Sequence, residues 1–206
     1  MHRVATVLCG IALLLAPLAS HGGRQQYEPL SASVQASLSR AIADQAVPFL
    51  AFDDEHEARA WLAAMSSRLA KRIPDRVARE ELLVTVHYEA KRAGLDPQLV
   101  LGLIQVESAF RKYAVSRVGA RGYMQVMPFW AKLIGTTEHN LFHLRTNLRY
   151  GCTILRHYLD IENGNLFRAL GRYNGSLGKA DYPNTVLRAW EGTWRYMSPS
   201  AAGTKH

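Results

Sequence analysis

Apolar side chains recur at helical spacing along most of this chain. Val34, Leu38 and Ile42 follow one another at four-residue steps, and a similar stripe begins at Trp61. Such stripes are typical of helices that bury one face. No segment has the alternation of a strand and no internal repeat is present, so the sequence predicts an all-α protein. The expected helices are 31–47, 53–73, 75–93, 128–134, 147–162, 166–172 and 181–194, with one more that begins at Pro97 and carries Glu107.

The first twenty residues have the pattern of a secretory signal. His2 and Arg3 give a positive start, an apolar core of residues 4–18 follows, and Ala19 and Ser20 are small residues near the expected cleavage point. The alternative is an uncleaved membrane anchor, for which about seventeen apolar residues lie at the short limit. The pattern favours cleavage and therefore predicts an exported protein.

Composition and charge narrow the partners without deciding among them. A formal net charge of +8 and 48% apolar residues describe a basic chain that can build a globular core. The charge suggests a polyanionic partner, and an exported chain meets anionic cell wall and lipid head groups before nucleic acid. Cys152 is the one cysteine after the signal, so no internal disulfide is expected, and its helical stripe places it in the core. His139 and His143 lie four residues apart but lack further ligands nearby, so we expect neither a metal nor a cofactor.

The helix that begins at Pro97 carries the first candidate for chemistry. Residues 97–106 contain no charge, and Glu107 falls on the same face as Val100 and Leu103. A carboxyl on an apolar face loses hydration, which raises its pKa and allows it to act as a general acid. The alternative is an ion pair with Arg111, four residues later on the helix surface.

The segment after Glu107 is basic and punctuated by glycine. No other acidic residue occurs before Glu138, whereas five lysines and arginines do. Most glycosidases use two carboxyl groups, but in some the acetamido group of the substrate replaces the second. A lone carboxyl beside a polar loop is compatible with that exception.

Three ordered motifs resemble the soluble lytic transglycosylases, which cleave peptidoglycan and have a goose-lysozyme-like catalytic domain. The first combines Glu107-Ser108 with residues 114–116 (AVS) and 119–128 (GARGYMQVMP). The second is residues 147–151 (NLRYG), and the third is residues 169–175 (ALGRYNG). The resemblance extends over residues 75–194 and implies a helical, lysozyme-like domain in the bacterial periplasm.

The resemblance implies a reaction with one carboxyl group used twice. Glu107 would protonate the glycosidic oxygen between N-acetylmuramic acid and N-acetylglucosamine, with help from the acetamido group. It would then accept a proton from the 6-hydroxyl of the muramyl sugar, which closes a 1,6-anhydro ring without water.

The resemblance also assigns supporting roles, position by position. Ser116 and Gln125 match residues that hydrogen-bond the sugars, and Tyr173 matches a tyrosine whose hydroxyl orients the catalytic carboxyl. Met124 and Met127 match positions that line the groove. Gly122 matches one where the backbone must approach closely, and Ser108 one that steadies the helix end. The expected substrate-binding residues are Ser108, Ser116, Gly122, Met124, Gln125, Met127, Tyr173, Asn174 and Tyr182.

The expected organisation is a signal (1–20), an N-terminal helical extension (21–74), a catalytic domain (75–198) and a disordered tail (199–206). The extension either wraps the catalytic domain or forms a small separate unit. The chain departs from the family pattern at Tyr123, at Arg172 and at residues 175–178, which affects the expected handling of glycan ends and peptide stems more than the reaction.

Three alternatives to a lytic transglycosylase remain open at this stage. One is a goose-type lysozyme that hydrolyses the bond with Asp160 or Glu162 as base. Another is a non-catalytic peptidoglycan-binding accessory of a secretion or cell-division apparatus. The third, a basic nucleic-acid binder, lacks a recognisable binding motif and conflicts with the export signal.

Overall fold

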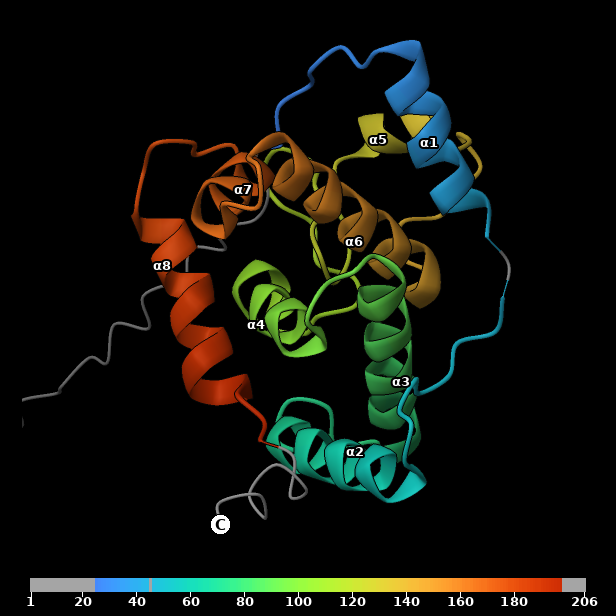
Figure 1. Ribbon diagram of the computed structural model, residues 1–206, viewed down its shortest axis with the longest axis vertical. Helices are drawn as coiled ribbons and strands as arrows, with labels where there is room; N and C mark the ends of the chain where they lie inside the picture. Colours follow the sequence, from blue (N-terminus) through green and yellow to red (C-terminus); the bar gives the residue numbers. More distant parts are fainter. Residues whose placement is uncertain (1–24, 45, 198–206) are drawn as a thin grey trace, which may run out of the picture.

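The helix that carries Glu107 lies at the centre of the fold. The computed structural model describes residues 25–44 and 46–197, and in it α4 (Pro97–Ser108) packs against α3 (Arg76–Arg92), α8 (Asp181–Arg188) and a π-helical turn, η1 (Ala189–Trp194) (Figure 1). Asp96 caps α4 by accepting a hydrogen bond of 2.7 Å from the Gln98 amide. The apolar side chains of α4 are buried on several sides, as its uncharged sequence predicts.

The remaining helices form a shell around this centre. Helix α6 contacts both α3 and α7, α1 lies on α5 and α6, and α2 packs on α3 (Figure 1). Within the described ranges the only β-type pairings are two isolated bridges, Val115–Arg121 and Arg121–Val126. The predicted all-α class is therefore confirmed. The bounds are α1 Ala32–Ala43, α2 Glu55–Leu69, α5 Pro128–Ile134, α6 Leu144–Ile161 and α7 Leu166–Asn174.

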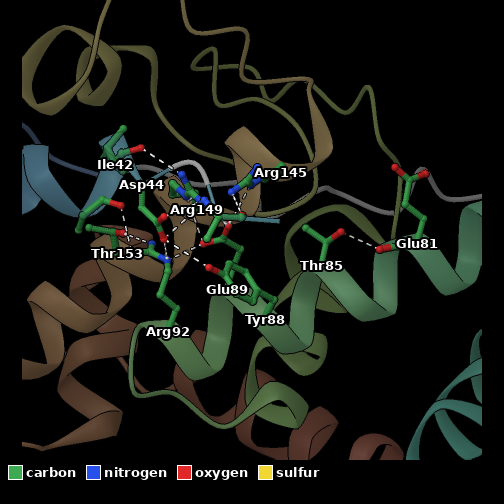
Figure 2. A network of polar contacts seen from close by, with 12 residues as sticks. Ile42, Asp44, Glu81, Thr85, Tyr88, Glu89, Arg92, Arg145, Arg149 and Thr153 are labelled. Atoms are coloured by element: carbon green, nitrogen blue, oxygen red, sulfur yellow. Dashed lines mark hydrogen bonds and ion pairs between the residues drawn. The ribbon is translucent and has the colours of Figure 1, made fainter. Parts of the chain in front are cut away.

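A buried ion network fastens the N-terminal extension to the rest of the chain (Figure 2). Glu89 on α3 is fully buried and lies 2.9 Å from both Arg92 and Arg149 and 3.7 Å from Arg145. Asp44, which directly follows α1, lies 3.8 Å from Arg92 and from Arg149. The two arginines also donate to backbone carbonyls near the end of α1. The extension thus wraps the helices that follow it.

Several helix boundaries differ from the sequence-based expectation. Helix α1 ends at Ala43 and α2 at Leu69, each four residues before the expected end, at 47 and 73. Helix α6 begins at Leu144 instead of Asn147, and His143 at its N-cap makes no side-chain capping bond. Asn147 was expected to start the helix, but its side chain is used for a loop contact described below. The final helix widens into a π-turn where the indole N–H groups of Trp190 and Trp194 donate to Asp96 and Gln105.

Some predictions concern residues that the structure does not describe. The expected signal (1–20) and the whole of the expected tail (199–206) fall in this category. Among residues 25–44 and 46–197, no helix is both long and apolar enough to cross a membrane.

Candidate active site

Glu107 lies one residue before the end of α4, where the chain reverses sharply. Ala109 and Phe110 follow with φ angles of 50° and 63°, in the left-handed region that non-glycine residues seldom adopt. Phe110 is held there by packing, because it is buried and its ring centroid lies 5.3 Å from that of Trp194. Strained backbone of this kind is often found beside functional groups. The turn leads the chain from the acid directly into the basic loop.

The carboxyl group of Glu107 is buried and hydrogen-bonded to a tyrosine. Glu107 is only 1% exposed, and its Oε1 accepts a hydrogen bond from the Tyr182 hydroxyl on α8. Burial raises the pKa of the Tyr182 phenol well above its usual value, and the neighbouring Glu107 carboxylate adds to the shift. The phenol therefore stays protonated and remains a donor at any physiological pH.

The exposed Arg111 side chain has a different partner. Its Nε donates to the Ser108 carbonyl at 3.0 Å, at the carboxyl end of α4. A solvated surface pair between Glu107 and Arg111, the alternative from the sequence, does not account for a carboxyl group with 1% exposure.

The hydrogen bond expected from Tyr173 is made by Tyr182 instead. The Tyr173 hydroxyl donates to the backbone carbonyl of Met124 at 2.7 Å, and the residue is fully buried. A phenol has one proton to donate, so this contact leaves the role of donor to Glu107 with Tyr182. The expectation that Tyr173 orients the carboxyl was therefore wrong, and Tyr173 instead fixes the loop that contains Met124.

The loop after α4 is shaped by hydrogen bonds to its own backbone. The Gly122 amide donates to the Ala114 carbonyl at 2.9 Å, and the Ser116 hydroxyl accepts from the Ala120 amide at 3.0 Å. Gln125 has φ of 48°, and its side-chain amide donates to the carbonyls of Ala114 at 3.1 Å and Gly122 at 2.9 Å. Gln125 is fully buried, and its side chain stabilises the fold of the loop. Its contact with a sugar stays a prediction.

Asn147 on α6 anchors this loop, a role that the sequence reading did not assign. Its Oδ1 accepts from the Met124 amide, and its Nδ2 donates to the carbonyls of Arg121 and Leu141, each at 2.8 Å. A Cβ atom at Gly122 would lie 2.4 Å from this Nδ2. The close approach expected at Gly122 is thus to the protein itself.

The other candidate residues divide into core and rim. Met124 is fully buried, and a Cβ on Gly151 would lie 2.3 Å from its sulfur, so Met124 packs behind the site and does not line a groove in this structure. Ser108 is buried and donates to the Ile104 carbonyl at 3.2 Å, which steadies the helix end as expected. Asn174 is 8% exposed at the end of α7, and Met127 is partly exposed at the start of α5.

Two cations and two aromatic rings cluster on the outer face of the loop, with the two rings between the cations. Lys112 lies 5.5 Å from the Tyr113 ring centroid, Tyr113 lies 5.9 Å from Phe142, and Arg121 lies 5.9 Å from Phe142 on the same cluster. Tyr113 is 71% exposed. We call these four residues the cation–aromatic ladder. It offers positive charge and ring faces to a partner on the same loop that follows Glu107.

No metal site accompanies these groups in the part of the chain that the structure describes. No cluster of three or more His, Cys, Asp or Glu side chains that could hold a metal ion occurs there. His139, one of the two histidines considered from the sequence, has its Nδ1 2.7 Å from the Tyr150 hydroxyl.

Comparison with known proteins identifies the family. The model of the transglycosylase SLT domain matches residues 85–185, a range that contains Glu107, the loop, Tyr173 and Tyr182. The chain belongs to the SLT-type lytic transglycosylase family. The match leaves out α1, which the ion network joins to α3 and α6, and α2, which packs on α3.

Individual relatives of this SLT-type protein match over short stretches. The transglycosylase of Enterobacteria phage PRD1 is 35% identical over 111 residues, which are 50% of this chain and 41% of the relative. Membrane-bound lytic murein transglycosylase C of Actinobacillus pleuropneumoniae is 50% identical over 52 residues, 25% of this chain and 14% of the relative. The protein of that name from Histophilus somni is 35% identical over 118 residues, with shares of 50% and 32%.

A solved structure, an inactive mutant of lytic transglycosylase Slt from Pseudomonas aeruginosa, aligns with a TM-score of 0.42 and 18% identity. It covers 84% of this chain and 36% of that chain. The SLT-type chain spans less than half the length of each of these proteins.

Proposed function

We propose that this chain is a peptidoglycan lytic transglycosylase in which Glu107 is the acid and then the base. The observation that carries the proposal is the buried Glu107 carboxyl held by the protonated Tyr182 hydroxyl, within a matched SLT domain. Relatives of the chain are named lytic murein transglycosylases, which supports the same substrate class. We also propose the periplasm as its location and glycan strands as its partner.

The reaction moves one proton through one carboxyl group. Glu107, initially protonated, donates to the oxygen that leaves C1 of the muramyl sugar while the acetamido oxygen stabilises the positive charge. The resulting carboxylate accepts the proton of the 6-hydroxyl as that oxygen forms a bond to C1. One C–O bond breaks and one forms, no water is consumed, and Glu107 regains its proton. Burial favours the acid before the first step, and the Tyr182 hydrogen bond stabilises the carboxylate between the steps.

The residues considered as a base for hydrolysis have other partners. Asp160 is an exposed residue of α6 that pairs with Arg156. Both oxygens of Glu162 are engaged, one by Arg168 and the other by Arg172. These ion pairs favour the single-carboxyl reaction over hydrolysis of the goose-lysozyme type.

Mass spectrometry of products from purified peptidoglycan tests the proposal. The mature chain should release muropeptides that lack one water, and Glu107→Gln should lose most of this activity because a general acid contributes about 10²–10⁴-fold. Ordinary reducing ends would identify a hydrolase. Products from neither protein, with both still bound to the cell wall, would identify a binding module.

A further inference from the structure

The segment that precedes α1 contacts the site residues through Gln25. We call residues 25–30 the strap, and Figure 1 shows it passing from beside α7 toward α1 above α5. Gln25 is 4% exposed, and its side-chain Oε1 accepts from the Met127 amide at 3.1 Å. Its Nε2 lies 3.5 Å from the Gln125 carbonyl, to which it donates. Gln25 also hydrogen-bonds Tyr173. A glutamine far away in sequence thus enters the group of residues that the family motifs define.

The two backbone groups that hold Gln25 are one acceptor and one donor. The Gln125 carbonyl is an acceptor and the Met127 amide is a donor, so together they bind a group with one N–H and one C=O. The Gln25 carboxamide supplies both. The acetamido group on N-acetylated sugars supplies both as well, and a sugar with a free amine does not, because it lacks the carbonyl.

The rest of the strap is weakly held. Residues 26–29 are exposed, and their contacts are a surface ion pair between Glu28 and Arg172 at 3.0 Å and an edge contact of Tyr27 with Phe129 at 5.8 Å. Surface ion pairs contribute little to stability. Arg172 stands at a position where the chain departs from the family pattern, and here it pairs with Glu28 of the strap. A segment anchored by one buried side chain can be displaced by a ligand that makes the same hydrogen bonds.

We infer that the Gln125 carbonyl and Met127 amide form an acetamido-binding position, and that Gln25 occupies it as an intramolecular competitor of N-acetylated glycan. The strap therefore has to leave before a strand binds, which lowers the apparent affinity by the fraction of molecules in the open form. The inference deepens the proposed function and rests on it for the identity of the natural ligand.

Binding to the inactive Glu107→Gln protein tests the inference. The probes are the tetramer of N-acetylglucosamine and its deacetylated counterpart, measured by calorimetry. Replacing Gln25 by Ala in this background should tighten binding of the N-acetylated tetramer by about three- to tenfold, since the competitor is removed. Gln25→Glu, which keeps the shape but loses the donor, should also tighten it. The deacetylated tetramer should gain nothing.

Gln35→Ala is the matched control. Gln35 is another glutamine of the N-terminal extension, and its Nε2 donates to the Leu133 carbonyl at 2.7 Å, away from the loop. Its replacement should leave both affinities unchanged. Unchanged or weaker binding after Gln25→Ala, in a variant with the melting temperature of its parent, would overturn the competition. An equal gain for the deacetylated tetramer, or no binding of the N-acetylated one by any variant, would overturn the acetamido position.

The outcome is separable from that of the product analysis. If the wild-type chain releases ordinary reducing ends or no products, the proposed function fails. A selective gain for the N-acetylated tetramer in Gln25→Ala would stand in either case, because that experiment measures binding by an inactive protein.

Discussion

Tyr182→Phe removes the hydrogen bond that the Tyr182 hydroxyl donates to the Glu107 carboxyl. Tyr182 is 6% exposed on α8, so phenylalanine fills the same space and removes only the hydroxyl. A hydrogen bond to a charged group contributes about 1.5–3 kcal/mol. Because the donor stabilises the carboxylate more than the neutral acid, its loss should raise the pKa of Glu107.

The sign of the effect on activity follows from the first chemical step. The proposed reaction starts with protonated Glu107, so kcat/KM should fall as pH rises through the pKa of this carboxyl. In Tyr182→Phe that decline should move to higher pH. The maximal kcat should drop about tenfold to a hundredfold, because the carboxylate formed in the first step loses its donor. The assay is release of anhydro products across a pH series.

Tyr173→Phe is the control for this experiment. Its hydroxyl donates to the Met124 carbonyl, so the change should cost about 0.5–1.5 kcal/mol of stability and leave the pH of the decline in place. If Tyr182→Phe left the profile unchanged, or if both variants moved it equally, the assignment of Tyr182 as the donor to the acid would be refuted.

Three further outcomes follow from the structure. Glu89→Gln should lower the free energy of unfolding in urea by about 3–5 kcal/mol, because it leaves the buried Arg149 without its partner. The control is Glu80→Gln, which breaks a partly exposed pair with Arg76 and should change this free energy by less than about 1 kcal/mol. Burial lowers the pKa of His87 to about 4, so the unfolded state binds more protons between the unfolded pKa near 6.5 and pH 4. The contribution of His87 to stability should therefore be fully present above pH 6.5 and should decline as pH falls toward 4. His87→Phe should make the urea midpoint fall less steeply over this range. An equally steep fall in the variant would count against His87. Replacing both Lys112 and Arg121 of the cation–aromatic ladder by Gln should weaken sedimentation with peptidoglycan at low salt and reduce its salt dependence. Lys71→Gln, in the exposed turn that follows α2, should do neither.

Local sequence determined the parts of the fold that depend on neighbours in the chain. Asp54, Asp75 and Asp96 cap α2, α3 and α4, because each side chain accepts from an amide two residues later. The start of α6 was missed because His143 offers no capping side chain. The closing π-turn was missed as well, because its two indole groups contact distant parts of the chain. Trp190 donates to Asp96, 94 positions earlier, and Trp194 donates to Gln105, 89 positions earlier.

The site shows the same division more strongly. Glu107 and its buried helix face could be read from spacing, but Tyr182 is 75 residues away and nothing in the pattern separates it from Tyr173 as the donor. Asn147 reaches Met124 across 23 residues, and Gln25 reaches Gln125 across 100. Such contacts depend on how the helices pack, so a periodicity argument has no access to them.

These distant contacts also explain why the site tolerates unfavourable local geometry. Ala109, Phe110 and Gln125 all have positive φ, and residues held there cost of order 1–3 kcal/mol each. Phe110 is held by Trp194, and the loop that carries Gln125 is held by Asn147. Helix α4 also packs closely against η1, because a Cβ on Gly102 would lie 2.9 Å from the backbone nitrogen of Trp190. This packing restricts movement of the turn after Glu107. Packing remote from the carboxyl therefore fixes where the carboxyl lies, and substitutions at Gly102 should impair activity through that geometry without touching the acid.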